Sequence, residues 1–167
     1  MPPSQFSSVV IAFILATLCG CHAPQTTRRE FPAAPSPITR YRAPSTREIK
    51  TLAHAARHGD AQAQFYLGWL HHVGLGVKQN NSIALKHLQA SARHGSNEAC
   101  LLLGIMYHRG EGVARDDVEA YKWLLLAVSP EQEDEITDYR ERVASGLSDF
   151  QISEARRRAA NLGHPDR

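Results

Sequence analysis

Apolar residues recur with helical spacing through most of the chain, and the whole pattern repeats every 36 residues. Ala63, Leu67 and Leu70, for example, fall on one face of a helix. A shift of 36 positions superimposes residues 60–95 on residues 96–131 with 10 identities, and the motif Ala-Arg-His-Gly occurs at 56–59 and again at 92–95. Internal repeats of this length predict a solenoid of helical pairs.

Each unit predicts two helices joined by a short turn that contains glycine. In the first unit, Asp60 and Asn80 can cap helix N-termini, and Gly74 can end the first helix in the left-handed conformation. The second unit offers equivalent caps at Ser96, Gly110 and Asp116. The apolar stripes of the second helices are Ala84, Leu88 and Ala92 in one unit and Ala120, Leu124 and Val128 in the next.

Further helices are predicted on both sides of these two units. Residues 50–59 match residues 86–95 at six of ten positions, so they read as the second half of an earlier, incomplete unit. Ser129 and Ser148 each begin a capping pattern with glutamine three positions on, which predicts two terminal helices. We therefore expect about seven helices after residue 45.

Two glycines, Gly68 and Gly104, fall inside predicted helices at equivalent positions. Glycine in a helix interior costs about 0.5–1 kcal/mol relative to alanine, so its presence in both units requires a reason. We expect that each glycine allows the preceding helix to approach closely.

The repeats resemble a known family. The second unit carries Ala99, Leu103-Gly104, Tyr107, Gly110-x-Gly112-Val113 and then Asp116, Ala120 and Trp123, which resembles the signature of Sel-one-like repeats (SLR), relatives of tetratricopeptide repeats. In the first unit, His71, Asn80 and His87 stand where the signature has Tyr, Asp and Trp. The resemblance implies an all-α fold, a short right-handed α-solenoid of helix-turn-helix repeats whose first helices line a concave face. It also implies a non-catalytic adaptor for a protein or peptide partner.

The N-terminus resembles the signal peptide of a bacterial lipoprotein. Residues 9–18 form an apolar run of signal-peptide length, too short for a comfortable membrane span. The following Leu18-Cys19-Gly20-Cys21 resembles a lipobox, which implies that Cys21 becomes the acylated first residue. No Lys or Arg precedes the run, and Cys19 is an uncommon residue at its lipobox position. A buried N-terminal helix with a chance cysteine is the alternative.

The segment after Cys21 predicts a tether. Five of the nine prolines lie between residues 22 and 45, and no helical or strand period is present there. We therefore expect a signal peptide over 1–20, a disordered Pro/Arg-rich tether over 21–45 and a repeat domain over 46–164. That domain divides into a half-unit (46–59), two repeats (60–95 and 96–131) and C-terminal capping helices (132–164). The arginines of the tether suit either anionic lipid headgroups and cell-wall polymer or simple solubility.

Composition and motifs exclude several classes of function. A formal net charge of +2 is too small to predict a nucleic-acid binder, and three cysteines cannot build a disulfide scaffold. Phosphate-binding loops and hydrolase or metalloprotease motifs are missing from the sequence. The repeat explains four of the nine histidines, which occupy two repeated positions (His58 and His94, His72 and His108), and we expect no metal and no cofactor. Cys100 lies in an apolar run and is predicted to be buried.

These observations predict a lipid-anchored adaptor of the bacterial cell envelope, on the outer membrane facing the periplasm. Its membrane contact would be the lipid on Cys21, and its partner a protein or peptide of unknown identity. The candidate groove is the exposed side of the first helices: Tyr66, Trp69, His72, Leu102, Ile105, His108 and Arg109. The alternative for several of these residues is a place in the core. Alternative functions are a non-lipidated periplasmic or secreted repeat protein and a β-lactam-hydrolysing relative of cysteine-rich repeat proteins, whose paired cysteines this chain lacks.

Overall fold

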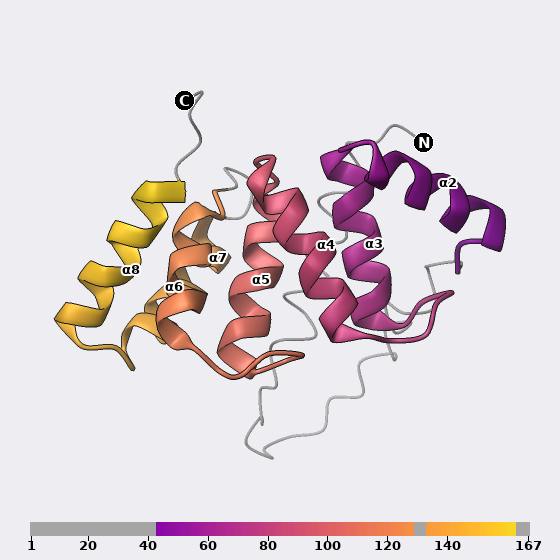
Figure 1. Ribbon diagram of the computed structural model, residues 1–167. Helices are drawn as coiled ribbons and strands as arrows, with labels where there is room; N and C mark the ends of the chain where they lie inside the picture. The colour runs from indigo at the N-terminus through magenta and orange to yellow at the C-terminus, as the bar shows by residue number, and fades with distance from the viewer. Residues whose placement is uncertain (1–42, 129–132, 163–167) are drawn as a thin grey trace, which may run out of the picture. The chain divides into compact units, whose positions relative to one another are not determined.

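All regular elements in the described part of the chain are helices. The computed structural model describes residues 43–128 and 133–162, and these ranges hold seven helices and no strand (Figure 1). The helices are α2 (Thr46–Arg57), α3 (Ala61–Val73), α4 (Asn81–Arg93), α5 (Asn97–Arg109), α6 (Asp117–Leu126), α7 (Glu133–Ala144) and α8 (Asp149–Leu162). The prediction of an all-α repeat fold is confirmed. The predicted signal peptide and residues 21–42 of the predicted tether lie outside the described residues, as does the predicted cap at Ser129.

The helix ends follow the predicted caps. Asp60 accepts a hydrogen bond from the backbone N–H of Ala63, and Asn80 accepts one from Ile83. Gly74 ends α3 with φ of 76°, in the left-handed region that glycine adopts without a Cβ clash. Ser96, Gly110 and Asp116 make the same contacts in the second unit, and Ser148 forms the predicted reciprocal box with Gln151.

The helices pack as consecutive pairs, because each buries one apolar stripe against the next. Helix α3 packs against α4, α5 packs against α6, and α4 joins the two pairs by packing against α5. Helix α2 covers α3 at one end, and α7 and α8 both pack against α6 at the other. Most of the largest fully buried side chains lie in the two central pairs, among them Phe65, Leu88, Leu101, Leu103, Met106 and Leu124.

Buried polar side chains tie neighbouring helices together. Gln64 Nε2 donates to the carbonyl of Ala56 at 3.1 Å and so links α3 to α2. Ser91 Oγ donates to the carbonyl of Ala61 at 2.7 Å, which links the end of α4 to the start of α3. Each of these bonds gives a hydrogen-bond partner to a polar atom that burial removes from water.

The mid-helix glycines allow a close approach, but to a different helix from the predicted one. A Cβ on Gly68 would lie 2.7 Å from Cγ of Leu88 and 3.2 Å from the carbonyl oxygen of Ala84. A Cβ on Gly104 would meet Leu124 and Ala120 in the same way. These neighbours belong to the following helix of the same unit, so the expected approach of the preceding helix is wrong. The glycines hold each helical pair together.

Val128 departs from the predicted stripe. Helix α6 ends at Leu126, and the side chain of Val128 is 42% exposed beyond its end. The second unit therefore buries Ala120 and Leu124 but not the third predicted position. No helix within residues 43–128 and 133–162 has the length and apolar character that a membrane span requires.

Candidate functional site

The seven residues of the predicted groove separate into a buried group and a more exposed group. Leu102 and Ile105 are each 1% exposed, and Trp69 is 6% exposed. Tyr66, His72 and His108 are half-buried on α3 and α5, and the guanidinium of Arg109 reaches the surface.

The expectation that Leu102 and Ile105 line an exposed groove is therefore corrected. Helix α5 is the central helix of the stack and packs against both α4 and α6, so apolar residues on several of its sides become buried. The same holds for most of Trp69 on α3, which packs against α2 and α4. For these three residues the structure supports the alternative of a place in the core.

The more exposed residues meet at a carboxylate that the prediction did not include. Glu111 lies in the turn after α5, and its Oε2 is 3.7 Å from Nε2 of His72 in the preceding unit. Its Oε1 is 3.6 Å from Nη1 of Arg109. One acidic side chain thus contacts a histidine from one repeat and an arginine from the next, so the contact crosses the junction between units.

A second polar contact lies one helix further along. Nδ1 of His108 is 2.7 Å from Oδ1 of Asp117, whose other oxygen accepts a hydrogen bond from Arg115 at 2.7 Å. Hydrogen bonds from Arg115 and His108 hold the pKa of Asp117 below its ordinary value, although partial burial opposes them. The ring of His108 also meets the ring of Tyr139 on α7 edge to face, with centroids 5.7 Å apart. Burial raises the pKa of the Tyr139 hydroxyl.

These contacts form what we call the polar strip, which passes from α3 through α5 to α7: His72, His108, Arg109, Glu111, Asp117 and Tyr139. Sequence reasoning missed Glu111, Asp117 and Tyr139. The sequence does distinguish Glu111. The Gly-x-Gly-Val turns of the two units differ at one position only, which is Leu75 in the first unit and Glu111 in the second. Tyr139 lies outside the repeated units, so the repeat could not point to it.

The polar strip includes one pair of side chains of a kind that catalytic sites also use. His108 and Asp117 have the arrangement of a general base and its orienting carboxylate. However, no hydroxyl or thiol of the described residues hydrogen-bonds His108. The thiol of Cys100 is buried as predicted, at 1% exposed, and burial raises its pKa to about 12. Across residues 43–128 and 133–162, no three His, Cys, Asp or Glu side chains are grouped as metal ligands.

The chain was compared with known proteins. The Sel1 repeat model matches residues 61–96 and 97–129. A crystal structure of c5321, described as a protective antigen of uropathogenic Escherichia coli strains with an SLR fold, is 29% identical with a TM-score of 0.64 and is matched over 69% of this chain and 25% of its own. A Sel1 repeat protein from Oxalobacter formigenes is 27% identical with a TM-score of 0.51, over 70% and 51% of the two chains. A search of curated protein sequences finds no relative.

The fold and these matches define the class: an α-helical repeat protein with the SLR fold. More particularly, the segments that match the Sel1 repeat model hold the helical pairs α3–α4 and α5–α6. It spans about a quarter of the length of the E. coli antigen and about half that of the Oxalobacter protein.

Proposed function

We propose that this chain is a non-catalytic adaptor of the bacterial cell envelope, anchored by a lipid on Cys21, whose polar strip binds a protein or peptide. The observation that carries the proposal is the contact of Glu111 with His72 and Arg109, because it extends hydrogen-bonding groups across two repeats on the side of the first helices. Binding residues that recur along a stack are the usual means by which repeat proteins hold an extended partner.

An aromatic ring on α3 supports this role. Tyr66 is half-buried beside Phe65, with ring centroids 5.6 Å apart, and burial raises the pKa of its hydroxyl. Tyrosine and arginine are enriched where proteins meet, since each offers both apolar area and hydrogen bonds.

Site-specific crosslinking in cells tests the binding surface. A photoreactive phenylalanine at position 66 replaces one aromatic residue with another on α3, and the same probe at Phe150, which is 80% exposed on α8, serves as the matched control. We expect a discrete crosslinked product from position 66 only. Arg109→Ala should remove that product and leave the helical circular dichroism unchanged. Crosslinks of equal yield from both positions would contradict the proposal.

Mass measurement tests the anchor separately. Mature protein from the wild-type chain should begin at Cys21 and carry acyl mass, whereas Cys21→Ser should carry none. A wild-type protein without acyl mass would instead show a non-lipidated periplasmic or secreted form. The basis for the anchor is the resemblance of residues 18–21 to a lipobox.

A further inference from the structure

Charge is distributed unevenly along the helical stack. Between residues 43 and 96 all six lysines and arginines are exposed: Arg47, Lys50, Arg57, Lys78, Lys86 and Arg93. The same segment holds only two carboxylates, Glu48 and Asp60. Glu48 belongs to the capping box of α2, and Asp60 caps α3. Asp60 forms no ion pair with the six cations in the described residues.

Five cations of the other half form ion pairs, whereas Arg140, Arg142 and Arg156 form none within the described residues. Arg109 contacts Glu111, and Arg115 bonds to Asp117. In the last helices, Lys122 pairs with Glu119, and Arg157 and Arg158 pair with Glu154. Of the nine lysines and arginines without an ion pair in the described residues, six therefore lie at the end of the stack that follows residue 45.

The repeat explains how this difference arises. Lys50, Lys86 and Lys122 are separated by 36 residues and occupy one position of successive second helices. Only Lys122 has a carboxylate three residues before it, Glu119, and its side chain folds back to that partner and becomes buried. The equivalent positions before Lys50 and Lys86 hold Arg47 and Ile83. Their ammonium groups consequently stay in solvent.

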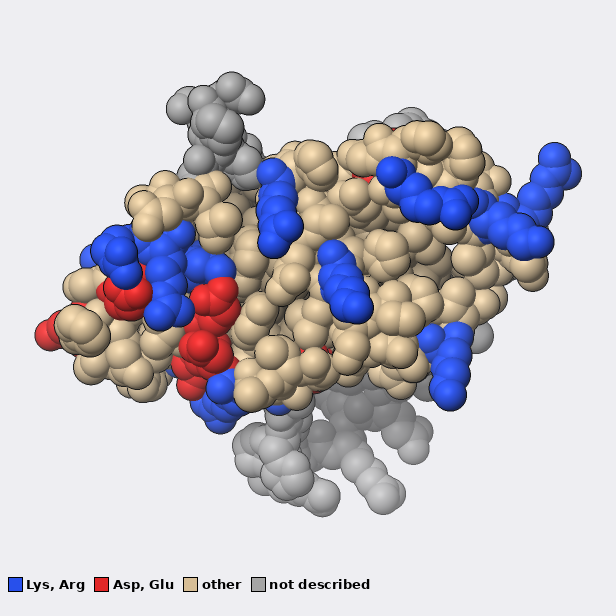
Figure 2. Space-filling model, in the orientation of Figure 1, with Lys and Arg blue, Asp and Glu red and all other residues tan. Residues whose placement is uncertain are grey.

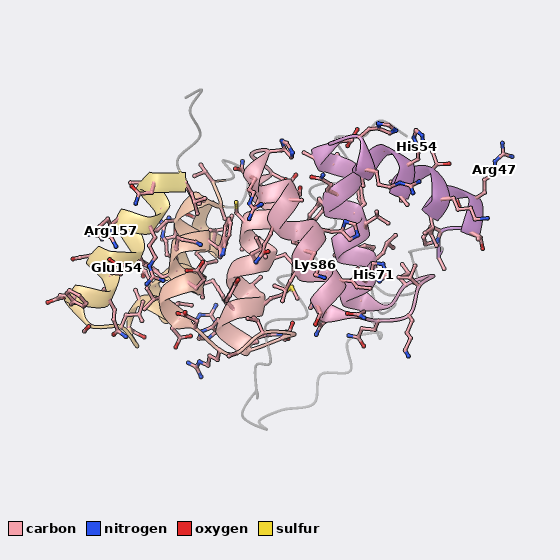
Figure 3. The ribbon with its side chains drawn as sticks, in the orientation of Figure 1. Arg47, His54, His71, Lys86, Glu154 and Arg157 are labelled. Carbon is pink, nitrogen blue, oxygen red and sulfur yellow. The ribbon has the colours of Figure 1, made fainter. Side chains whose placement is uncertain are left out.

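We call these six cations the basic face; five of them lie on α2 and α4, and Lys78 lies between α3 and α4. Figure 2 shows lysine and arginine side chains spread over α2 and α4 with almost no acidic atoms between them, whereas red and blue groups mix over α6 and α8. Arg47 and Lys86, labelled in Figure 3, project from the start of α2 and from the middle of α4. Arg57 and Arg93 are also separated by 36 residues. Lys50 and Arg57 on α2 therefore occupy the same repeat positions as Lys86 and Arg93 on α4.

We propose that the basic face docks on a membrane surface of anionic phospholipid. Phosphate headgroups complement a set of exposed cations that form no ion pair within residues 43–128 and 133–162, and such a surface attracts each lysine or arginine close to it. The basic face also directly follows the sequence segment with Arg28, Arg29, Arg40 and Arg42, downstream of the proposed acylation site. The inference thus rests on the proposed envelope location. A basic surface beside a lipid anchor adds an electrostatic contribution to membrane binding.

Vesicle sedimentation with the full chain tests this docking. Lys86→Gln/Arg93→Gln removes two charges from the basic face, and Arg142→Gln/Arg156→Gln removes two exposed charges from α7 and α8 as the matched control. On vesicles containing phosphatidylglycerol, we expect the first variant to bind at least about tenfold more weakly and the control to change less than about threefold. Lys50→Gln/Arg57→Gln on α2 should reproduce the first result. Vesicles of phosphatidylcholine alone should not distinguish the variants.

Equal weakening by both charge pairs would overturn the proposal, since net charge alone would then govern binding. It is also overturned if the basic-face variant binds vesicles as the wild type does but loses affinity for duplex DNA or polyglutamate, because the face would then serve another polyanion or an acidic protein. Failure of the anchor is distinguishable: a wild-type chain without acyl mass leaves the difference between the two charge variants intact.

Discussion

Gly104 illustrates how a missing side chain can determine the distance between two helices. A Cβ at this position would lie 2.7 Å from Cγ of Leu124 and 3.2 Å from the carbonyl oxygen of Ala120. Leu124 is fully buried, so it has little room to move. Contacts of this length force the helices apart or push a core side chain from its preferred rotamer.

We therefore expect Gly104→Ala to destabilise the fold. Alanine gains about 0.5–1 kcal/mol from helix propensity, whereas overpacking a core costs about 1–3 kcal/mol, so the clash should dominate. Urea denaturation followed by circular dichroism should show a net loss of roughly 1–2 kcal/mol. Gly146→Ala is the control, because a Cβ there would meet nothing closer than 3.6 Å, and it should be neutral or slightly stabilising. Equal effects of both substitutions would show that the close approach is not limiting.

Glu119 joins the last repeat to the C-terminal helix. Its carboxylate pairs with Lys122 on its own helix and with Arg158 of α8 at 3.2 Å. The ammonium group of Lys122 is buried and lies 4.1 Å from the centroid of the Trp123 ring. Removing the carboxylate would leave this buried charge without its counter-ion, and such losses are expensive.

The Glu119→Gln variant keeps the shape of the side chain and removes only its charge. Because the buried ammonium group of Lys122 then loses its counter-ion, the free energy of unfolding should fall by roughly 2–4 kcal/mol. Arg157→Gln provides the comparison, since Arg157 contacts Glu154 in an exposed pair on the same C-terminal part (Figure 3) and its loss should change stability little. Thermal unfolding of the two variants side by side gives the measurement. If Arg157→Gln were the more damaging, the assignment of Glu119 as the central link would be wrong.

A histidine pair joins α3 to α4 where the resemblance led us to expect tyrosine and tryptophan. The rings of His71 and His87 stack with centroids 6.2 Å apart and an angle of 6° between their planes. Burial, and to a smaller degree the nearby His71, lower the pKa of His87 from its ordinary value of 6.5. The equivalent pair in the next unit is Tyr107 and Trp123, of which the tryptophan cannot take up a proton in this range.

This pair should make stability depend on pH. Because the folded chain binds a proton at His87 less readily than the unfolded chain, its contribution is complete above about pH 6.5 and is lost as the pH falls toward the lower folded-state value. The melting temperature of the wild type should consequently drop between pH 7 and pH 5 more than that of His87→Gln. His94, an exposed histidine at the end of α4, provides the control. For the assignment to hold, the melting temperature of His94→Gln must fall between pH 7 and pH 5 as much as that of the wild type.

The sequence predicts the repeated elements well and the departures from the repeat poorly. The caps at Asp60, Asn80 and Ser96 depend on local hydrogen bonds, so short motifs suffice to locate them. The burial of Leu102 and Ile105 depends instead on the helices that pack around α5. Helical periodicity identifies an apolar face, but it does not predict that α4 and α6 both cover this helix. For the same reason Tyr139 of the polar strip was missed, because it reaches His108 only through the packing of α7.

A short stack must protect its ends, and α8 protects one of them. Alanines at 155 and 159 of this helix are buried, and Arg158 reaches Glu119 on α6. The opposite side of α8 carries exposed polar residues such as Arg156, which suits a terminal helix facing water. Without α8, the side of α6 that it covers would be exposed to solvent, and two repeats with one half-unit are close to the minimum for a stable solenoid.

A chain that ends at Gly146 should therefore unfold at a lower temperature and self-associate, because an uncovered repeat offers its apolar side to a second copy. Size-exclusion chromatography with light scattering would report the association, and circular dichroism the loss of cooperative unfolding. A chain that ends at Leu162 keeps all of α8 and should behave as the wild type does. If the shorter chain were monomeric with an unchanged melting temperature, α8 would be dispensable, and the charges of Arg158 and Glu119 would serve a purpose other than closing the stack.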